Sequence, residues 1–425
     1  MKHTGKILCI LALAVPFVWA SCEKIGKDPD KKEEFEEKPL VLTRSESQLV
    51  KGTNSFTFNL FKEVLASDQH NGRDIMVSPL SASFVLGALN NGATGETSQE
   101  ITDVLGFSDG TVEDINAFCR KIMRESGFVD NDVVLEMANA VMINRNYGLK
   151  EQFEEKIVTY YDAYIESIDF SDVDGVVKRV NDWCNTHSGG LIPRIIEKEE
   201  VVPSTVLYAL NSLYFKGEWK EKFKEEHTRK EVFTGINGSQ SRLDMMSRHD
   251  NMQYYYTDTW SCVSLPYGNG SFSMYIILPD EGVAFNDFIA SLDSDVWNDV
   301  LTSTGKYHEV SFKMPKLDVE CSFDLIEMME ALGMKKAFSP VEAELTEMCT
   351  GAAGMYLGLL KQKSRIIVDE SGTEAAAVTI GGVLETSSPN SGKEPILFHA
   401  DRPFVYLIQE NNTGTIYFIG AKLRP

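Results

Sequence analysis

Apolar residues recur every three or four positions in the first third of the chain. Over residues 58–65 this spacing predicts an amphipathic helix. A second helix is predicted over residues 81–89, because Ser78 can cap its first turn and Pro79 suits its first position. The Asn91-Gly92 pair is a turn signal that should end this helix.

The later part of the chain carries apolar runs that are typical of β-strands. Residues 205–215 are almost continuously apolar, as expected for a strand buried on both faces. Residues 133–143 and 272–278 form similar runs, and residues 404–408 and 415–419 flank a polar turn, which indicates a hairpin. Because helices precede strands without βαβ alternation, the pattern predicts an α+β fold.

Composition excludes several classes of protein. The 425 residues carry 41 Lys and Arg against 63 Asp and Glu, a formal net charge of −22, so we expect no nucleic-acid partner. Seven cysteines are too few for a disulfide scaffold. No internal repeat or Pro/Gly-rich linker interrupts the chain from Gly52 to Pro425.

The N-terminus has the pattern of an export signal. Lys2 and Lys6 precede an apolar run over residues 7–19, and Ala20-Ser21-Cys22 follows, which predicts a secretory signal peptide over residues 1–21. The run is shorter than the ~20 residues of a membrane-spanning helix. Its ending resembles a bacterial lipoprotein signal, which implies lipidation of Cys22 after export across the inner membrane. Ordinary cleavage near Ala20, with an incidental Cys22, is the alternative.

A charged stretch follows the signal. Residues 23–39 carry seven acidic residues and five lysines, so we expect residues 22–45 to be a flexible linker. The acid-rich stretch resembles the surface-export signals of Bacteroidetes lipoproteins. This resemblance implies a lipid anchor in the outer membrane, exposed at the cell surface, with the bilayer as a partner.

Catalytic motifs are missing from the sequence. It has no HExxH, GxSxG, Walker or GxGxxG pattern, and no two histidines stand at metal-ligand spacing. The five cysteines after Cys22 form no CxxC pair, so we expect buried thiols. We therefore expect no enzyme activity, no metal and no cofactor. The absence of motifs does not address a triad assembled from distant residues.

Residues 369–382 carry conflicting local signals. Ser371 and Glu374 form a capping-box pattern that favours a helix, whereas the β-branched residues 378–380 favour a strand. Residues 386–392 are rich in Ser, Pro, Asn and Gly, which is typical of an exposed loop. One interpretation is a short capped helix before a loop. The other is a segment with two states, exposed loop and inserted strand, which its small side chains would permit.

This segment resembles the reactive-loop hinge of the serpins, a family of suicide protease inhibitors. Further blocks that resemble the family follow in order from about Asn54 to Pro425. They include Val77-Ser78-Pro79-Leu80-Ser81, Asn181-Asp182-Trp183, Asn211-Ser212-Leu213-Tyr214-Phe215-Lys216-Gly217-Glu218-Trp219, Leu265-Pro266-Tyr267, Met314-Pro315-Lys316 and Phe398-His399-Ala400-Asp401-Arg402-Pro403-Phe404. The resemblance implies helices and three β-sheets in one domain over residues 46–425. A large central sheet would accept a reactive loop at about residues 370–395 as an added strand.

The resemblance also implies a mechanism and partners. In serpins the target protease attacks the exposed loop and forms an acyl-enzyme, and the cleaved loop then inserts into the central sheet and traps the protease. The chain is thus expected to be a monomeric, irreversible inhibitor of a serine protease, with an elastase-like enzyme favoured, or of a papain-like cysteine protease. The alternative is a non-inhibitory serpin that acts as a surface binding or structural protein.

The hinge of the family maps onto this chain residue by residue. Gly372 is the pivot, and Thr373 is the first side chain expected to enter the sheet. Glu374 should alternate outward. The whole hinge comprises Glu370, Gly372, Thr373, Glu374, Ala375, Ala376 and Ala377.

A polar cluster beneath the opening sheet maps onto Ser78, Ser81 and Asn211. Gln362 stands where the family often has a histidine. An amide can donate and accept hydrogen bonds but does not titrate, so a pH switch at this position is not expected.

The reactive bond follows from the family spacing. Sixteen residues after Glu370 is Thr386, which places the bond between Thr386 and Ser387 and suits a small primary pocket. The loop is longer than in many serpins between Ser387 and Lys393. Two alternatives therefore remain, Leu384 for a chymotrypsin-like pocket and Lys393 for a trypsin-like pocket.

Overall fold

The computed structural model describes residues 35–425 except residues 109, 189, 191, 204, 352 and 374–393. In this part of the chain, helices and strands form one unit, Phe35–Pro425. The α-helices are α1 (Arg44–Ala66), α2 (Pro79–Asn90), α3 (Gly95–Val104), α4 (Val112–Glu125), α5 (Glu151–Tyr161), α6 (Val173–His187), α7 (Phe285–Ser291), α8 (Ser294–Ser303) and α9 (Ile326–Leu332).

The described strands form three sheets, so the predicted α+β fold is confirmed. The strands are β1 (Ile75–Val77), β2 (Val133–Asn144), β3 (Gly148–Leu149), β4 (Tyr164–Ile168), β5 (Leu207–Glu218), β6 (Arg229–Thr234), β7 (Gln240–Tyr256), β8 (Trp260–Pro266), β9 (Phe272–Pro279), β10 (Lys306–Pro315), β11 (Leu317–Asp324), β12 (Cys349–Thr350), β13 (Leu359–Val368), β14 (Gly372–Thr373), β15 (Ile396–His399), β16 (Phe404–Glu410) and β17 (Ile416–Lys422).

The larger sheet has nine strands and the central sheet has six. The nine-stranded sheet runs β1-β17-β16-β9-β8-β7-β10-β15, and β6 pairs with β7. The central sheet runs β11-β13-β14-β5-β2-β4. Strands β3 and β12 form a separate pair. Of the three predicted apolar strands, β2 and β5 lie inside the central sheet and β9 lies inside the nine-stranded sheet. The predicted hairpin is β16–β17.

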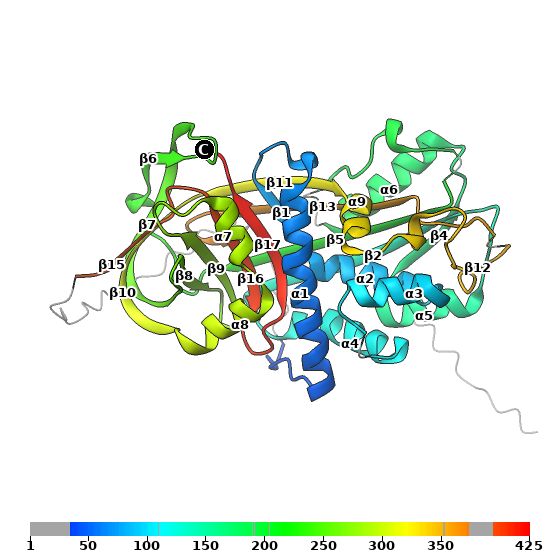
Figure 1. Cartoon of the computed structure of the whole chain (residues 1–425), viewed down its shortest axis with the longest axis horizontal. Helices are drawn as coiled ribbons and strands as arrows, with labels where there is room; N and C mark the ends of the chain where they lie inside the picture. The colour runs from blue at the N-terminus through cyan, green and yellow to red at the C-terminus, as the bar shows by residue number, and fades with distance from the viewer. Residues whose placement is uncertain are drawn as a thin grey trace, which may run out of the picture. The chain divides into compact units, whose positions relative to one another are not determined.

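Helix α2 lies between the two large sheets. Every residue of α2 is buried, and the helix contacts β5 on one side and β17 on the other. Helix α6 packs on the opposite face of the central sheet, where it covers a smaller apolar cluster with β2 and β5 (Figure 1). The central sheet is therefore covered on both faces, which explains the nearly continuous apolar sequence of β5.

Local signals account for the helix starts. Ser78 caps α2, because its hydroxyl accepts a hydrogen bond from the Ser81 N–H, and Pro79 occupies the first helical position as predicted. Helix α1 begins earlier than the apolar spacing alone suggested. Thr43 and Glu46 form a capping box there, in which Thr43 Oγ1 accepts from Glu46 N and Glu46 accepts from Thr43 N.

The expected linker over residues 22–45 differs from the structure in its last part. Residues 35–43 lie against the body, Leu40 is completely buried, and α1 begins at Arg44. The high charge of residues 23–39 suggested disorder, but the charge is concentrated before Pro39 and the apolar residues come after it. Signal residues 1–21, Cys22 and the rest of the expected linker lie outside the described residues.

Membrane and metal sites were also sought. Across the described ranges, no helix is both long and apolar enough to cross a bilayer. In the same part of the chain, no group of three or more His, Cys, Asp and Glu side chains could hold a metal ion. The five described cysteines are buried and unpaired, which confirms the expectation of free thiols.

Candidate functional site

The central sheet is split along most of the boundary between β5 and β13. These parallel strands pair directly only where residues 208–211 face residues 359–362, which we call the closed end. At the other end, which we call the open end, β14 lies between them. Thr373 is opposite Val368 of β13 and Gly217 of β5. Between the two ends, β5 and β13 make no direct pairing in the described structure.

The start of the hinge is therefore already a strand. Gly372 and Thr373 run antiparallel to both neighbours, so the helical interpretation of the capping-box pattern is wrong for these two residues. The local helix signal is overridden by tertiary structure. The edges of β5 and β13 provide backbone hydrogen-bond partners for this segment on both sides, and these stabilise it more than a helix cap would.

Thr373 enters a closed aromatic environment. Only 1% of its surface is exposed, and its hydroxyl shares a hydrogen bond of 2.6 Å with the Tyr267 hydroxyl. The Tyr267 ring stacks on Trp219 with 4.4 Å between centroids and meets the edge of Phe215 at 5.0 Å. Burial raises the pKa of Tyr267, so its hydroxyl stays protonated and able to donate.

Gly372 makes a contact that only glycine allows. A Cβ atom on this residue would lie 2.1 Å from the carbonyl oxygen of Gly217 and 2.8 Å from Glu218 Cα. Backbone atoms cannot yield as a flexible side chain can, so any side chain at this position would push β14 away from β5.

Glu370 fixes the turn that leads into β14. Its carboxylate accepts a hydrogen bond from Thr228 and forms an ion pair with Lys316, both at 2.6 Å. Burial would raise the pKa of Glu370, but these two partners outweigh it and lower the pKa below its ordinary range. The backbone carbonyl of Glu370 accepts from the Phe223 N–H at 2.9 Å, which ties the turn to the segment after β5.

The predicted polar cluster meets at the closed end. Gln362 faces Asn211 at the last direct pairing between β5 and β13. Gln362 Oε1 accepts from Ser78 N at 2.9 Å, and Gln362 Nε2 donates to Ser78 O at 2.8 Å. The Ser81 hydroxyl donates to Asn211 Oδ1. The structure thus brings all four predicted residues together, although their role in opening the sheet stays a prediction.

Sequence reasoning missed two members of the site. Asn139 of β2 accepts a hydrogen bond of 2.8 Å from Asn211 and extends the cluster across the sheet. A polar residue inside the apolar run 133–143 was a signal for it. Tyr267 lay in a quoted family block, but no sequence signal pointed to its bond with Thr373.

Several predicted site residues cannot be placed. The hinge residues Glu374, Ala375, Ala376 and Ala377, the bond between Thr386 and Ser387, the alternatives Leu384 and Lys393, and Cys22 lie outside the described residues.

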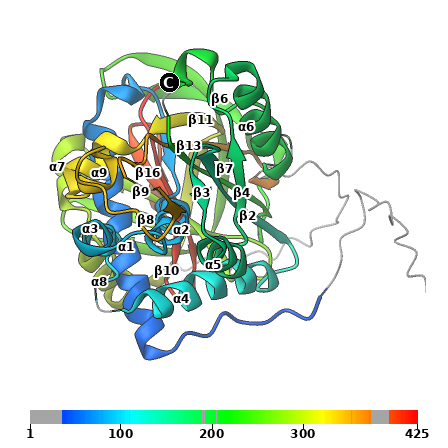
Figure 2. The same ribbon diagram turned by 90° about the vertical axis from the view of Figure 1, so that its right-hand side faces the viewer.

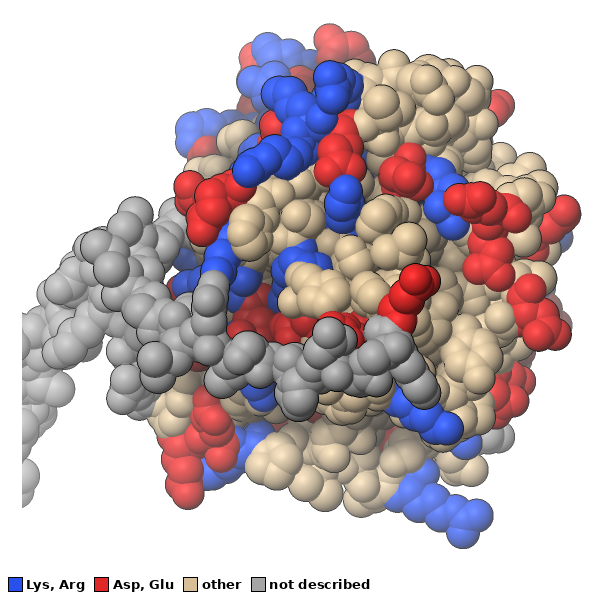
Figure 3. Space-filling model, turned by 90° about the vertical axis from the view of Figure 1, so that its left-hand side faces the viewer, with Lys and Arg blue, Asp and Glu red and all other residues tan. Residues whose placement is uncertain are grey.

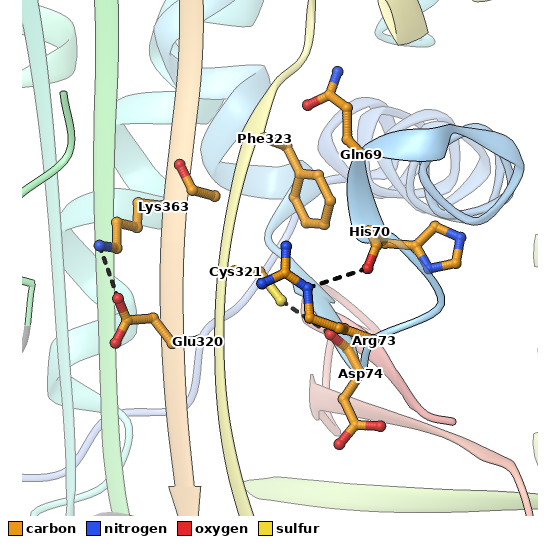
Figure 4. A pocket seen from close by; sticks show the side chains of 9 residues that line it. Gln69, His70, Arg73, Asp74, Glu320, Cys321, Phe323 and Lys363 are labelled. Carbon is orange, nitrogen blue, oxygen red and sulfur yellow. Dashed lines mark hydrogen bonds and ion pairs between the residues drawn. The ribbon is translucent and has the colours of Figure 1, made fainter. Parts of the chain in front are cut away.

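A pocket lies elsewhere, at the edge of the central sheet (Figure 4). It measures about 200 Å³ and lies between β11 and the turn after α1, where Arg73 and Cys321 border it. Lys363 and Glu320 form an ion pair of 2.7 Å on its rim. Burial raises the pKa of the Cys321 thiol to about 11, so this sulfur is not a ready nucleophile.

The end of the molecule that carries β6, β10 and β15 has charges of both signs (Figure 3). Lys and Arg side chains gather at the top of this face, with acidic side chains beside them. Some are paired, such as Lys313 with Glu231 at 2.8 Å and Lys230 with Asp244 at 3.4 Å. The overall acidity therefore does not extend evenly over this end.

Known proteins are similar to this chain in both sequence and architecture. Residues 51–425 match the family model for Serpin (serine protease inhibitor). An uncharacterized serpin-like protein of Thermococcus kodakarensis is 30% identical over 381 residues, which cover 89% of this chain and 86% of that protein. The leukocyte elastase inhibitor of Equus caballus is 29% identical and covers 89% of this chain and 100% of its own. The crystal structure of the thermophilic serpin tengpin in the native state has a TM-score of 0.81 at 27% identity, covering 92% of this chain and 98% of tengpin. The chain belongs to the serpin family.

Proposed function

We propose that this serpin is an irreversible suicide inhibitor of a serine protease, or of a papain-like cysteine protease, and is not an enzyme itself. The observation that carries the proposal is β14: two hinge residues already lie between β5 and β13, and the split continues from them to the closed end. Insertion needs a strand that has already been started and, ahead of it, neighbouring strands that do not pair with each other.

The register of β14 predicts how far insertion runs. Thr373 is opposite Gly217, so an antiparallel continuation would bring Thr379 opposite both Asn211 and Gln362 at the closed end. Residues 374–378 would lie between the stretches of β5 and β13 that do not pair with each other. The next residues would replace the direct pairs between 208–211 and 359–362, and the strand would pass the first residue of β5, Leu207, at position 383.

This register favours Thr386 as the residue that carries the protease. Thr386 would follow the end of the inserted strand by only three residues, so a protease attached there would be pulled tightly against the far end of the sheet. If the protease were attached at Lys393, about ten residues would separate it from the end of the inserted strand at position 383, and it would be held less tightly. At about 3.3 Å per residue, insertion from Thr373 to Thr386 would carry the protease on the order of 45 Å.

The covalent step belongs to the protease. Its serine or cysteine nucleophile attacks the Thr386 carbonyl carbon, the new acyl bond forms, and the C–N bond to Ser387 breaks. The proton from the nucleophile passes through the protease base to the new amine of Ser387. The ester or thioester persists only if insertion distorts the protease before water hydrolyses it.

The uninserted state must then be protected by a kinetic barrier, because insertion gains strand pairing and burial. The closed end is a good location for this barrier. Separating Gln362 from Asn211 disturbs a buried, hydrogen-bonded cluster, and each bond broken before its replacement forms raises the barrier.

Two measurements test the inhibitor proposal. Incubation with elastase-like and papain-like proteases should give a covalent complex that survives SDS, and the released C-terminal fragment should begin at Ser387. A fragment that begins at Glu394 would move the reactive bond to Lys393. Loop cleavage without inhibition across the protease panel would favour a non-inhibitory binding or structural protein.

We also propose that Cys22 carries the lipid that anchors the protein, in the outer membrane and facing outward. The proposal rests on the small residues before Cys22 and the acid-rich stretch after it. Labelled palmitate should be incorporated into the native chain and not into the Cys22→Ala variant. Equal labelling of both would contradict it.

A further inference from the structure

Residues 35–40, which we call the strap, bind to the body before α1 begins. Figure 2 shows this blue segment running below α4. The Phe35 ring packs edge-on against Phe128 with 5.2 Å between centroids. The backbone N–H and C=O of Phe35 both bond to the Asn131 side chain, at 3.1 and 2.9 Å. These contacts hold the strap on the turn that precedes β2.

Glu37 connects that turn to a second one. Its Oε1 accepts from the Asn131 N–H at 2.9 Å, and its Oε2 accepts from Asn269 Nδ2 at 3.1 Å. Asn269 lies in the turn between β8 and β9. These hydrogen bonds lower the pKa of Glu37, so the bridging carboxylate is charged at neutral pH.

The other end of the strap reaches a third turn. Leu40 is completely buried, and its carbonyl accepts from Asn412 Nδ2 at 2.7 Å. Asn412 lies in the turn between β16 and β17. The strap therefore joins the start of β2, in the central sheet, to two turns of the nine-stranded sheet.

The first two of these turns lie beside the open end of the split. Val133, the first residue of β2, is opposite Gly217, which is opposite Thr373. Tyr267, the partner of Thr373, comes two residues before Asn269. Full insertion requires β5, with its neighbour β2, to separate from β13. The strap ties the turn before β2 to the turns that flank β9 and β16, so a change in this arrangement would strain its contacts.

We propose that the strap is a brace that prolongs the lifetime of the uninserted sheet, with this chain's own N-terminal segment as the bound partner. The inference rests on the proposed function, because it concerns the same loop insertion. Releasing the strap, for instance by proteolysis just beyond it, would shorten the lifetime of the inhibitor.

The test uses the full chain and compares Phe35→Ala/Glu37→Ala with Glu36→Ala. Glu36 is the matched control, because its side chain is 88% exposed and its replacement removes the same charge from the next position. The single variant Glu37→Ala keeps the contact between Phe35 and Phe128, so it still tests the proposal if the double variant does not fold. The measured quantity is the rate at which uncleaved protein, held at an elevated temperature, converts to a form that resists unfolding in urea.

We expect the double variant to convert at least about threefold faster than the native chain, Glu37→Ala to lie between them, and Glu36→Ala to match the native chain. Equal rates in all four proteins would overturn the brace, even where protease complexes form normally. If the cleaved native protein gains no resistance to urea, loop insertion itself fails, and the proposed function is overturned together with the brace.

Discussion

The two large sheets share one interior but are paired to different extents. In the nine-stranded sheet, β16 pairs with β9 at six consecutive positions, and all seven residues of β16 and of β17 are buried. In the central sheet, β13 and β5 are 10 and 12 residues long, yet they pair directly at only four positions. Among the described residues, β16 and β9 pair continuously, whereas β13 and β5 pair with each other only at the closed end.

The side chains at the two boundaries differ accordingly. Strands β16 and β9 pack apolar residues such as Leu407 and Ile277 against the core. The closed end of the split instead buries Ser78, Ser81, Asn211 and Gln362 in a hydrogen-bonded cluster. Apolar packing is not directional, so a new strand cannot replace it contact by contact. Hydrogen bonds are directional, and a buried cluster of them holds two strands together until an inserted strand supplies replacement donors and acceptors. This difference suggests why one boundary is permanent and the other can open.

The largest expected effect comes from Thr373→Arg at the open end. A charge forced into the closed site beside Tyr267 costs several kcal/mol of desolvation, so the hinge should not enter the sheet. We expect the yield of SDS-stable protease complex to fall by about a hundredfold, with the loop cleaved as a substrate. Thr373→Ser is the control, because it keeps the hydroxyl and should inhibit normally. Undiminished inhibition by the arginine variant would contradict the insertion mechanism.

Gln362→Ala tests the closed end. It leaves the backbone N–H and C=O of Ser78 without their side-chain partner in a buried position, which should lower the free energy of unfolding of the native form by about 2–3 kcal/mol. Thermal or urea unfolding of the uncleaved protein measures this. Gln99→Ala, at an exposed position on α3, is the matched control and should change little. A loss below about 0.5 kcal/mol would show that the cluster does not hold the boundary.

Gly372→Ala separates the hinge from the rest of the open end. The added methyl group collides with the Gly217 carbonyl, so β14 should leave the split while the closed end stays paired. We expect the backbone amide of Thr373 to exchange with solvent at least about tenfold faster. Gly127→Ala provides the comparison, since a Cβ there has nothing within 4 Å. Unchanged protection of Thr373 would argue that β14 is not held by this contact.

The smallest effect is a pH dependence at Glu370. Its pKa lies below the ordinary value of 4.5 in the folded protein, so its charged form adds stability above that value and loses it as the pH falls through the lowered pKa. The native chain should thus lose slightly more stability than Glu370→Gln between pH 7 and pH 3.5. Parallel melting curves for the two proteins over this range would rule out a role for the Lys316 pair.

Local sequence signals predicted much of the fold. The Ser78 cap, the Pro79 start and the apolar runs of β2, β5 and β9 depend on residues near each other in the chain, and each is confirmed. The family blocks predicted which distant residues would meet in the polar cluster. The predicted end of the flexible linker at residue 45 was wrong. The high charge of residues 23–39 indicated disorder, and nothing in the local sequence indicated that Leu40 would be buried against the body.

What the sequence by itself determined is the set of elements, the serpin family and the small-residue hinge, because spacing, caps and motifs are written in consecutive residues. Only the tertiary structure decided that Gly372 and Thr373 already lie in the central sheet, that Tyr267 holds Thr373, and that residues 35–40 bind across three turns. These contacts join residues that are far apart in the chain. Their formation depends on which backbone groups and cavities the assembled sheets leave open, and no local pattern encodes that.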